Sequence, residues 1–458
     1  MSLFRTKPID VIGTSKGLHR CLSAFDLTLL GVGAIIGAGI FVLTGIAAAT
    51  KAGPAIIISY ILAGSASALS ALCYAELAAS IGGCGSAYGY AYAGFGEIIA
   101  WIIGWDLLLE YGISCSAVAN GWSGYVNNGL TAMGLHIPTF LLKSPLEGGI
   151  INLPAALIVL VIMFLLARGV RESTRFNAVM VFLKLSAIAI FVAVASFHVN
   201  PSNWHPFMPF GWNGVVGGAA LIFFAYIGFD AVSTAADEAI RPERDLPIGI
   251  IASLIICTAI YVLVAALLTG VVPYTTLNVS SPVADVLLNL GHRFGAGMVA
   301  AGAIAGLTTV ILVMYYGLTR IMLAMAGDGL LSPSLTHIDA KKRTPTKIIY
   351  ITGVLMAALS GLLPIGHLAE LVNIGTLAAF VVVCCGVIFL RYTRPDIPRP
   401  FKVPFSPVVP AIGVIFCIYL MTHLTGRTWI AFSIWSAVGL IIYFCYSRKR
   451  SALAIAGQ

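Results

Sequence analysis

The sequence predicts an all-α polytopic membrane protein, and two observations support this fold class. The 458-residue chain is 59% hydrophobic and only 10% charged, with a mean hydropathy of +0.98. Soluble domains are roughly 45 to 50% apolar and about 25% charged, which excludes a soluble enzyme. The apolar residues also form continuous runs of helix length, whereas strands of a transmembrane barrel would alternate apolar and polar residues.

Twelve apolar runs qualify as membrane spans, because a helix needs about 20 residues to cross the hydrocarbon core. Shorter runs are included where flanking residues allow the bilayer to thin. The 48 glycines suit close packing of these helices. The predicted spans are residues 25–49, 54–79, 98–119, 153–167, 176–197, 214–236, 248–272, 295–325, 348–363, 368–390, 408–424 and 429–446.

The basic residues predict the orientation of these spans. Of the 26 Lys and Arg residues, those on the sparsely charged side are Lys51, Lys143, Arg293 and Arg427, and Lys184 lies inside a span. The positive-inside rule then places both termini in the cytoplasm. We expect the protein to lie in the plasma (inner) membrane. The first span lacks a cleavage site of small residues, so we expect it to be retained. Because topology accounts for the net charge of +8, we expect no nucleic-acid partner.

The sequence contains no catalytic or metal-binding pattern. Its eight histidines form no close pair, and neither a nucleophile elbow nor a phosphate-binding loop occurs. Most of the nine cysteines fall inside predicted spans, where we expect them to pack rather than to bind metal. We therefore expect no cofactor and no metal, and neither an enzyme nor an ATP-driven pump.

Glycines predict a break in two of the spans. The first span carries four glycines between Gly31 and Gly39, and each costs a helix interior about 1 kcal/mol relative to Ala. The sixth places Gly228 and Asp230 at membrane depth. Glycines alone are equally compatible with two helices that merely cross closely.

The positions of the two breaks favour a functional interpretation. Gly37 and Gly228 each lie in the first helix of a five-helix unit, and an odd number of spans makes the second unit enter from the opposite face. The predicted organisation is a cytoplasmic N-terminal segment, two inverted five-helix repeats with discontinuous first helices, and two final spans with a cytoplasmic C-terminus. The corresponding residues are 1–24, 25–200, 201–390 and 391–458.

Unwound backbone at the membrane midplane is tolerated where it lines a cavity, and its free groups can then bind a ligand. Amides at the start of the outer half of helix 1, at Ala38 and Gly39, would face a carboxylate, with Ile36 and Gly37 completing the unwound segment. The carbonyls of Ile35, Phe224, Ala225 and Ile227 would accept from an ammonium. Such a site would recognise the backbone of an α-amino acid.

Five segments resemble signatures of the amino acid, polyamine and organocation transporter superfamily, and specifically of prokaryotic members of its cationic amino acid transporter family. They are Gly33–Phe41, Trp105–Gly112, Ser173–Val179, Phe223–Pro247 and Asn373–Phe380. The resemblance implies the leucine-transporter-type fold and amino acid uptake by alternating access. Many relatives have Thr in place of Ala38, and the acidic pair Asp237-Glu238 and the dipeptide Ala326-Gly327 also depart from the usual pattern.

Lys184 is the predicted proton-coupling residue. It lies eight residues into the fifth span, about 12 Å below the cytoplasmic edge, so its amine would either extend to the interface or stay buried. The resemblance implies a buried position between helices 1, 5 and 8, where sodium-coupled members of this fold hold an ion. There burial would lower the pKa of the ammonium and allow it to load and release a proton.

Several other side chains are candidates for substrate contact, gating or structure. Asp106 and Glu110 share one face of the third span; we expect Asp106 to be structural and leave Glu110 open between ligand and structural roles. The resemblance implies that Met314 faces the unwound segments. There it would either fill the side-chain end of the pocket or pack in the apolar core. Tyr226 is a candidate lining residue, and Asp230 is expected to cap the second half-helix.

The first functional hypothesis is therefore proton-coupled uptake of L-amino acids, either small neutral ones such as alanine or cationic ones. An amino acid exchanger of the same fold is the alternative, because an obligate exchanger needs no titrating group at the ion position. The expected partners are the amino acid, protons and the lipid bilayer. The sequence leaves open a small single-span membrane partner or a sterol-like lipid on the outer face.

Overall fold

The computed structural model describes residues 5–7, 22–81, 87–169, 174–230, 232–233, 239–339 and 344–456. The regular secondary structure of these residues is entirely helical, with no β-strand; one isolated bridge pairs Leu22 with Ala239. The predicted all-α class is thus confirmed for the described part of the chain.

Every predicted span contains helix. Seven helical segments of the described chain are long and apolar enough to cross a membrane. They coincide with or overlap α3 (Ile56–Ser80), α5 (Glu97–Ala132), α7 (Thr174–Ala195), α9 (Pro242–Val271), α11 (Arg293–Gly327), α13 (Ile365–Thr393) and α15 (Gly426–Ile442). Five shorter apolar helices are α1 (Ala24–Ile35), α6 (Leu153–Ala167), α8 (Gly211–Ile222), α12 (Thr346–Leu362) and α14 (Val408–Thr422). Twelve crossings remain a prediction.

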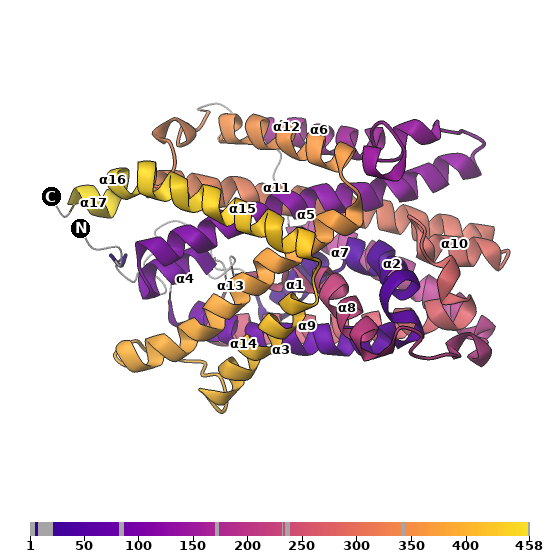
Figure 1. The fold of residues 1–458 in the computed structure, drawn as a ribbon, viewed down its shortest axis with the longest axis horizontal. Coiled ribbons are helices and arrows are strands. Elements are labelled where there is room, and N and C mark those ends of the chain that lie inside the picture. The colour runs from indigo at the N-terminus through magenta and orange to yellow at the C-terminus, as the bar shows by residue number, and fades with distance from the viewer. Residues whose placement is uncertain are drawn as a thin grey trace.

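The long helices α5, α11 and α15 run along the longest axis of the molecule (Figure 1). Both chain termini lie near one end, and α2 (Thr44–Ala47) and α10 (Pro282–Asn289) lie near the other. At the terminal end, Lys7 forms an ion pair with Asp328 at 2.8 Å, and the Ala452 amide donates to the Asp328 carbonyl at 2.9 Å. The two ends of the chain thus meet at the end of α11.

Glycines allow two central helices, α1 and α9, to pack closely together. A Cβ at Gly31 of α1 would lie 2.5 Å from Ser253 Oγ of α9, and one at Gly249 of α9 would lie 2.7 Å from Leu27 Cβ of α1. The pair α1 and α9 therefore packs at a distance that only glycine permits at these two positions.

A buried carboxylate of α3 binds both the end of α13 and the segment that follows it. Glu76 accepts from Arg391 Nε at 2.9 Å and from Arg391 Nη2 at 2.5 Å, and the Val403 amide donates to it at 2.6 Å. Arg399 Nε lies 3.6 Å away. Because Glu76 is only 2% exposed, the cluster supplies the partners that a buried charge requires.

One predicted span is longer than expected. The helix predicted over residues 98–119 is α5, which continues to Ala132. In the added part of the helix, the polar residues Asn120, Asn127 and Asn128 line a cavity beside it.

Candidate functional site

The first helix is interrupted where its glycines predict. Helix α1 ends at Ile35, Ile36 is extended with ψ of 103°, and a π-helical turn begins at Gly39. All residues from Gly31 to Leu43 are buried. The backbone between Ile35 and Gly39 therefore leaves its helical path inside the protein.

The sixth predicted span is interrupted as well. After α8, residues Phe223–Tyr226 form a 3-10 turn, Ile227 is extended, and Gly228 has a φ of +113°. An L side chain rarely adopts this φ, and a Cβ at Gly228 would lie 2.9 Å from the Ala34 carbonyl oxygen. Gly228 is thus required both for the turn and for its approach to α1.

The two interruptions lie in direct contact. A Cβ at Gly39 would lie 2.3 Å from Ala225 Cβ and 2.4 Å from Ala225 Cα. The backbone of one break therefore packs on the backbone of the other, and residues far apart in the sequence form one central site.

Tyr261 of α9 links the two breaks, and sequence reasoning missed it. Its hydroxyl lies 2.9 Å from the Ile35 carbonyl and 2.8 Å from the Ala225 carbonyl. Its ring packs against Tyr60 and Tyr226, with centroid distances of 5.2 Å and 5.5 Å. A tyrosine in an apolar helix gives no sequence signal for such a role, because its partners come from two distant segments.

This arrangement modifies the predicted ammonium site. The carbonyls of Ile35 and Ala225 share the single proton of the Tyr261 hydroxyl, and the Phe224 carbonyl accepts from the Ile227 amide at 3.3 Å. Each carbonyl oxygen carries two lone pairs, so one further donor can still bind. Three of the four predicted acceptors therefore already lie within hydrogen-bonding distance of an internal donor, and two of them share one proton.

The outer half of the first helix is fixed by hydroxyl groups. The Gly39 carbonyl accepts from Thr44 Oγ1 at 3.1 Å and from the Tyr60 hydroxyl at 3.4 Å, and these two hydroxyls lie 2.6 Å apart. Ala38, on the amide side of the break, is fully buried. The segment that carries the predicted carboxylate-binding amides is thus buried and held by hydrogen bonds from two side-chain hydroxyls.

Lys184 of α7 reaches the inner half of the first helix. Its Nζ donates to the Gly33 carbonyl at 2.7 Å, and the residue is 1% exposed. A Cβ at Gly306 of α11 would lie 2.7 Å from Lys184 Cγ, so the stem runs over a glycine. The amine is therefore buried between α1, α7 and α11 rather than exposed at the protein surface.

The acidic candidates form a second buried group on and near α5. Glu110 is hydrogen-bonded to Thr376 of α13, and Asp106 Oδ1 lies 2.6 Å from the position of a Cβ at Gly375. Asp106 and Glu110 thus share a face, as their spacing predicts, and that face meets α13.

Asp230 Oδ2 accepts from the Tyr111 hydroxyl at 3.2 Å. The half-helix that Asp230 was expected to cap lies mostly outside the described residues. The pair Asp237-Glu238 lies wholly outside them.

Tyr226 makes a contact between helices, and so does Tyr315, which follows Met314 in α11. The Tyr226 hydroxyl donates to the Tyr60 carbonyl at 2.8 Å, which turns the side chain toward α3. Tyr315 bonds the Ile349 carbonyl of α12, and Tyr316 stacks under the Arg320 guanidinium. Met314 is buried on α11. Tyr226 therefore has a structural contact, and the role of Met314 stays a prediction.

A polar cavity of about 600 Å³ adjoins the outer half of the first helix. Val42 and Gly121 form part of its lining, and a Cβ at Gly121 would lie 3.5 Å from Ala38 Cβ. Asn128 Nδ2 donates to Asp285 Oδ1 at 2.5 Å at its margin. Burial raises the pKa of the Asp285 carboxyl above its ordinary value, while hydrogen bonds from Asn128 and Ser281 oppose the shift.

A family model described as amino acid permease matches residues 22–445 of this chain. The chain belongs to the amino acid permease family. This permease is a multi-pass membrane protein of the amino acid, polyamine and organocation superfamily, and its relatives are transporters rather than enzymes.

Two relatives from Bacillus subtilis are each 50% identical to the permease. The methylthioribose transporter aligns over 99% of both chains, and so does the branched-chain amino acid permease. The human cationic amino acid transporter 4 is 37% identical over 87% of this chain and 64% of its own length. The family predicted from the sequence signatures is thus confirmed.

Proposed function

We propose that the permease is a secondary active transporter that takes up L-amino acids by alternating access. Its architecture would be the leucine-transporter type, with inverted repeats over residues 25–200 and 201–390. The observation that carries the proposal is the contact between Gly39 and Ala225, because it joins the interrupted first helices of the two predicted repeats at one buried site.

The proposed substrate group is the α-amino acid backbone. Amides at Ala38 and Gly39 would receive the carboxylate at the start of the outer half-helix. The carbonyls of Ile35, Phe224, Ala225 and Ile227, oriented in part by Tyr261, would accept from the ammonium. A substrate with both charges at one carbon satisfies both sets at once.

Neutral amino acids are the favoured substrates. A relative that is 50% identical is described as a branched-chain amino acid permease, and more distant relatives are described as cationic amino acid transporters. An equally similar relative is described as a methylthioribose transporter. A thio-sugar has neither an ammonium nor a carboxylate, so the backbone groups at the breaks favour the amino acid.

Lys184 is the proposed coupling group. Its bond to the Gly33 carbonyl lies two residues before the end of α1, so loss of the proton would remove a charged donor from the inner half-helix. The movement of a half-helix and the protonation of one amine would thereby be linked. The polar cavity beside Val42 and Gly121 would be the external entrance, with both termini on the cytoplasmic side.

Uptake into proteoliposomes tests the proposal. Labelled alanine, leucine, arginine and methylthioribose are supplied outside, with an inward proton gradient and with or without sodium. The proposal predicts accumulation of alanine or leucine that an uncoupler abolishes and sodium does not affect. Uptake that requires an amino acid inside the vesicles would instead support the exchanger.

A further inference from the structure

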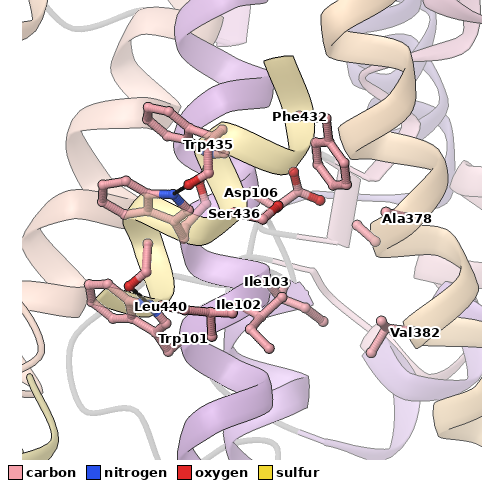
Figure 2. A pocket seen from close by; sticks show the side chains of 13 residues that line it. Trp101, Ile102, Ile103, Asp106, Ala378, Val382, Phe432, Trp435, Ser436 and Leu440 are labelled. Atoms are coloured by element: carbon pink, nitrogen blue, oxygen red, sulfur yellow. Dashed lines mark hydrogen bonds between the residues drawn. The ribbon is translucent and has the colours of Figure 1, made fainter. Parts of the chain in front are cut away.

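Away from the helix breaks, a cavity of about 140 Å³ lies between α5, α13 and α15. Figure 2 shows that its residues come from all three helices, including Ala378 and Val382 of α13 and Phe432 of α15. Ile102, which lines the cavity, is 40% exposed and lies within the predicted third span. The cavity is therefore accessible from the bilayer rather than from the central site.

Three indoles form one wall of this cavity. Trp105 and Trp435 stack with centroids 4.5 Å apart, and Trp101 stacks on Trp105 at 5.6 Å. Each indole N–H donates to a backbone carbonyl: Trp101 to Gly439 at 2.9 Å, Trp105 to Trp435 at 2.9 Å, and Trp435 to Trp105 at 3.2 Å. Because these donors are used, the wall presents aromatic carbon to the cavity.

Asp106 is the charged residue among those that line the cavity. It is 6% exposed, and its Oδ1 has no hydrogen-bond partner among the described residues. In Figure 2 the carboxylate lies between Phe432 and the indoles. It is about 14 Å along α5 from Glu97, at the helical rise of 1.5 Å per residue. An unpaired carboxylate at this depth is unfavourable unless a partner or a proton neutralises it.

We propose that this cavity binds a small lipophilic ammonium ion, whose charge pairs with Asp106 and whose apolar part packs on the indoles. Aromatic walls and one carboxylate are the combination that attracts an organic cation. The same charge repels anions, and no group of three His, Cys, Asp or Glu residues in the described chain would hold a metal ion. The volume suits a ligand below drug size, since pockets for drug-sized molecules measure roughly 300 to 1,000 Å³.

Tryptophan fluorescence tests this site, because three of the seven tryptophans line it. The full-length protein in lipid nanodiscs is titrated with 2-phenylethylamine and, as the uncharged counterpart of similar shape, with 2-phenylethanol. We expect a saturable change with the amine and an affinity weaker by about tenfold or more for the alcohol. Saturating L-alanine should not displace the amine, which separates this site from the proposed transport site.

Two variants and a control make the test specific. Asp106→Asn should weaken amine binding by about tenfold or more, and Ala378→Phe should abolish it by filling the cavity while Asp106 is retained. Asp396→Asn removes an exposed carboxylate elsewhere and should bind like the parent. Equal affinities for amine and alcohol, or unchanged amine binding in both cavity variants, would overturn the proposal. It would also be overturned by the absence of saturation, which indicates partition into lipid alone.

Discussion

The hydroxyl of Tyr261 lies 2.9 Å from the Ile35 carbonyl and 2.8 Å from the Ala225 carbonyl, and so joins the ends of two interrupted helices. One hydroxyl has one proton, so it can favour either acceptor as the two half-helices move. Tyr261 is therefore placed to keep both breaks in register during a transport cycle.

Removal of this hydroxyl should weaken the connection between the breaks. Tyr261→Phe keeps the aromatic contacts with Tyr60 and Tyr226 but leaves Ile35 and Ala225 without their donor. We expect a loss of about 1 kcal/mol in the free energy of unfolding and a lower maximal uptake rate. Unchanged uptake and unchanged thermal stability would show that Tyr261 only fills space.

Added methyl groups should distinguish the backbone contact from ordinary glycine packing. Gly39→Ala would place a Cβ 2.3 Å from Ala225 Cβ, so we expect substrate uptake to fall to background. Gly297→Ala of α11 is the matched control, because nothing lies within 4 Å of its added Cβ. If Gly39→Ala and Gly297→Ala transported equally well, the close approach of the two breaks would not be needed for transport.

Proton dependence should follow Lys184. In Lys184→Ala the Gly33 carbonyl loses its charged donor, and we expect no accumulation of amino acid in response to an inward proton gradient. Exchange between labelled and unlabelled amino acid should persist, because exchange needs no net proton movement. Proton-driven accumulation at the parental level in this variant would refute the coupling role.

The Glu76 cluster is expected to contribute to stability. Glu76→Gln removes the charge that faces Arg391 and Arg399, and we expect a loss of about 2 to 4 kcal/mol. Because Arg391 is partly exposed, we expect this loss in the free energy of unfolding to be smaller than for a fully buried ion pair. Unfolding in mixed micelles measures the effect. Asp396→Asn should behave like the parent, since its pair with Arg394 lies on the surface.

Composition and glycine spacing predicted much of this architecture. Four glycines before Phe41 and the Gly228-containing segment mark the breaks, because glycine is costly in an ordinary helix interior. A functional role for Lys184 could also be predicted from the sequence, since a lysine at membrane depth requires a partner. The pairing of Gly39 with Ala225 could not be predicted in detail, because it depends on how two segments separated by four spans come together.

The sequence was less informative where ordinary residues acquire a role from tertiary contacts. Tyr261 and the indoles of α5 and α15 are typical of apolar helices, and only packing reveals their partners. The span predicted over residues 98–119 ended too early, because the polar residues that follow it line a neighbouring cavity while α5 continues to Ala132. Asp106 was expected to be structural, and its unpaired oxygen became evident only in three dimensions.

The central claim is that the helix breaks recognise the backbone of an α-amino acid, and competition by modified substrates tests it most directly. Inhibition of labelled alanine uptake is measured with L-alanine, N-acetyl-L-alanine and L-alaninamide at equal concentrations. The proposed site predicts inhibition by L-alanine and loss of inhibition when either the ammonium or the carboxylate is blocked. Equal inhibition by all three compounds would contradict recognition by the backbone at Ala38, Gly39 and Ala225.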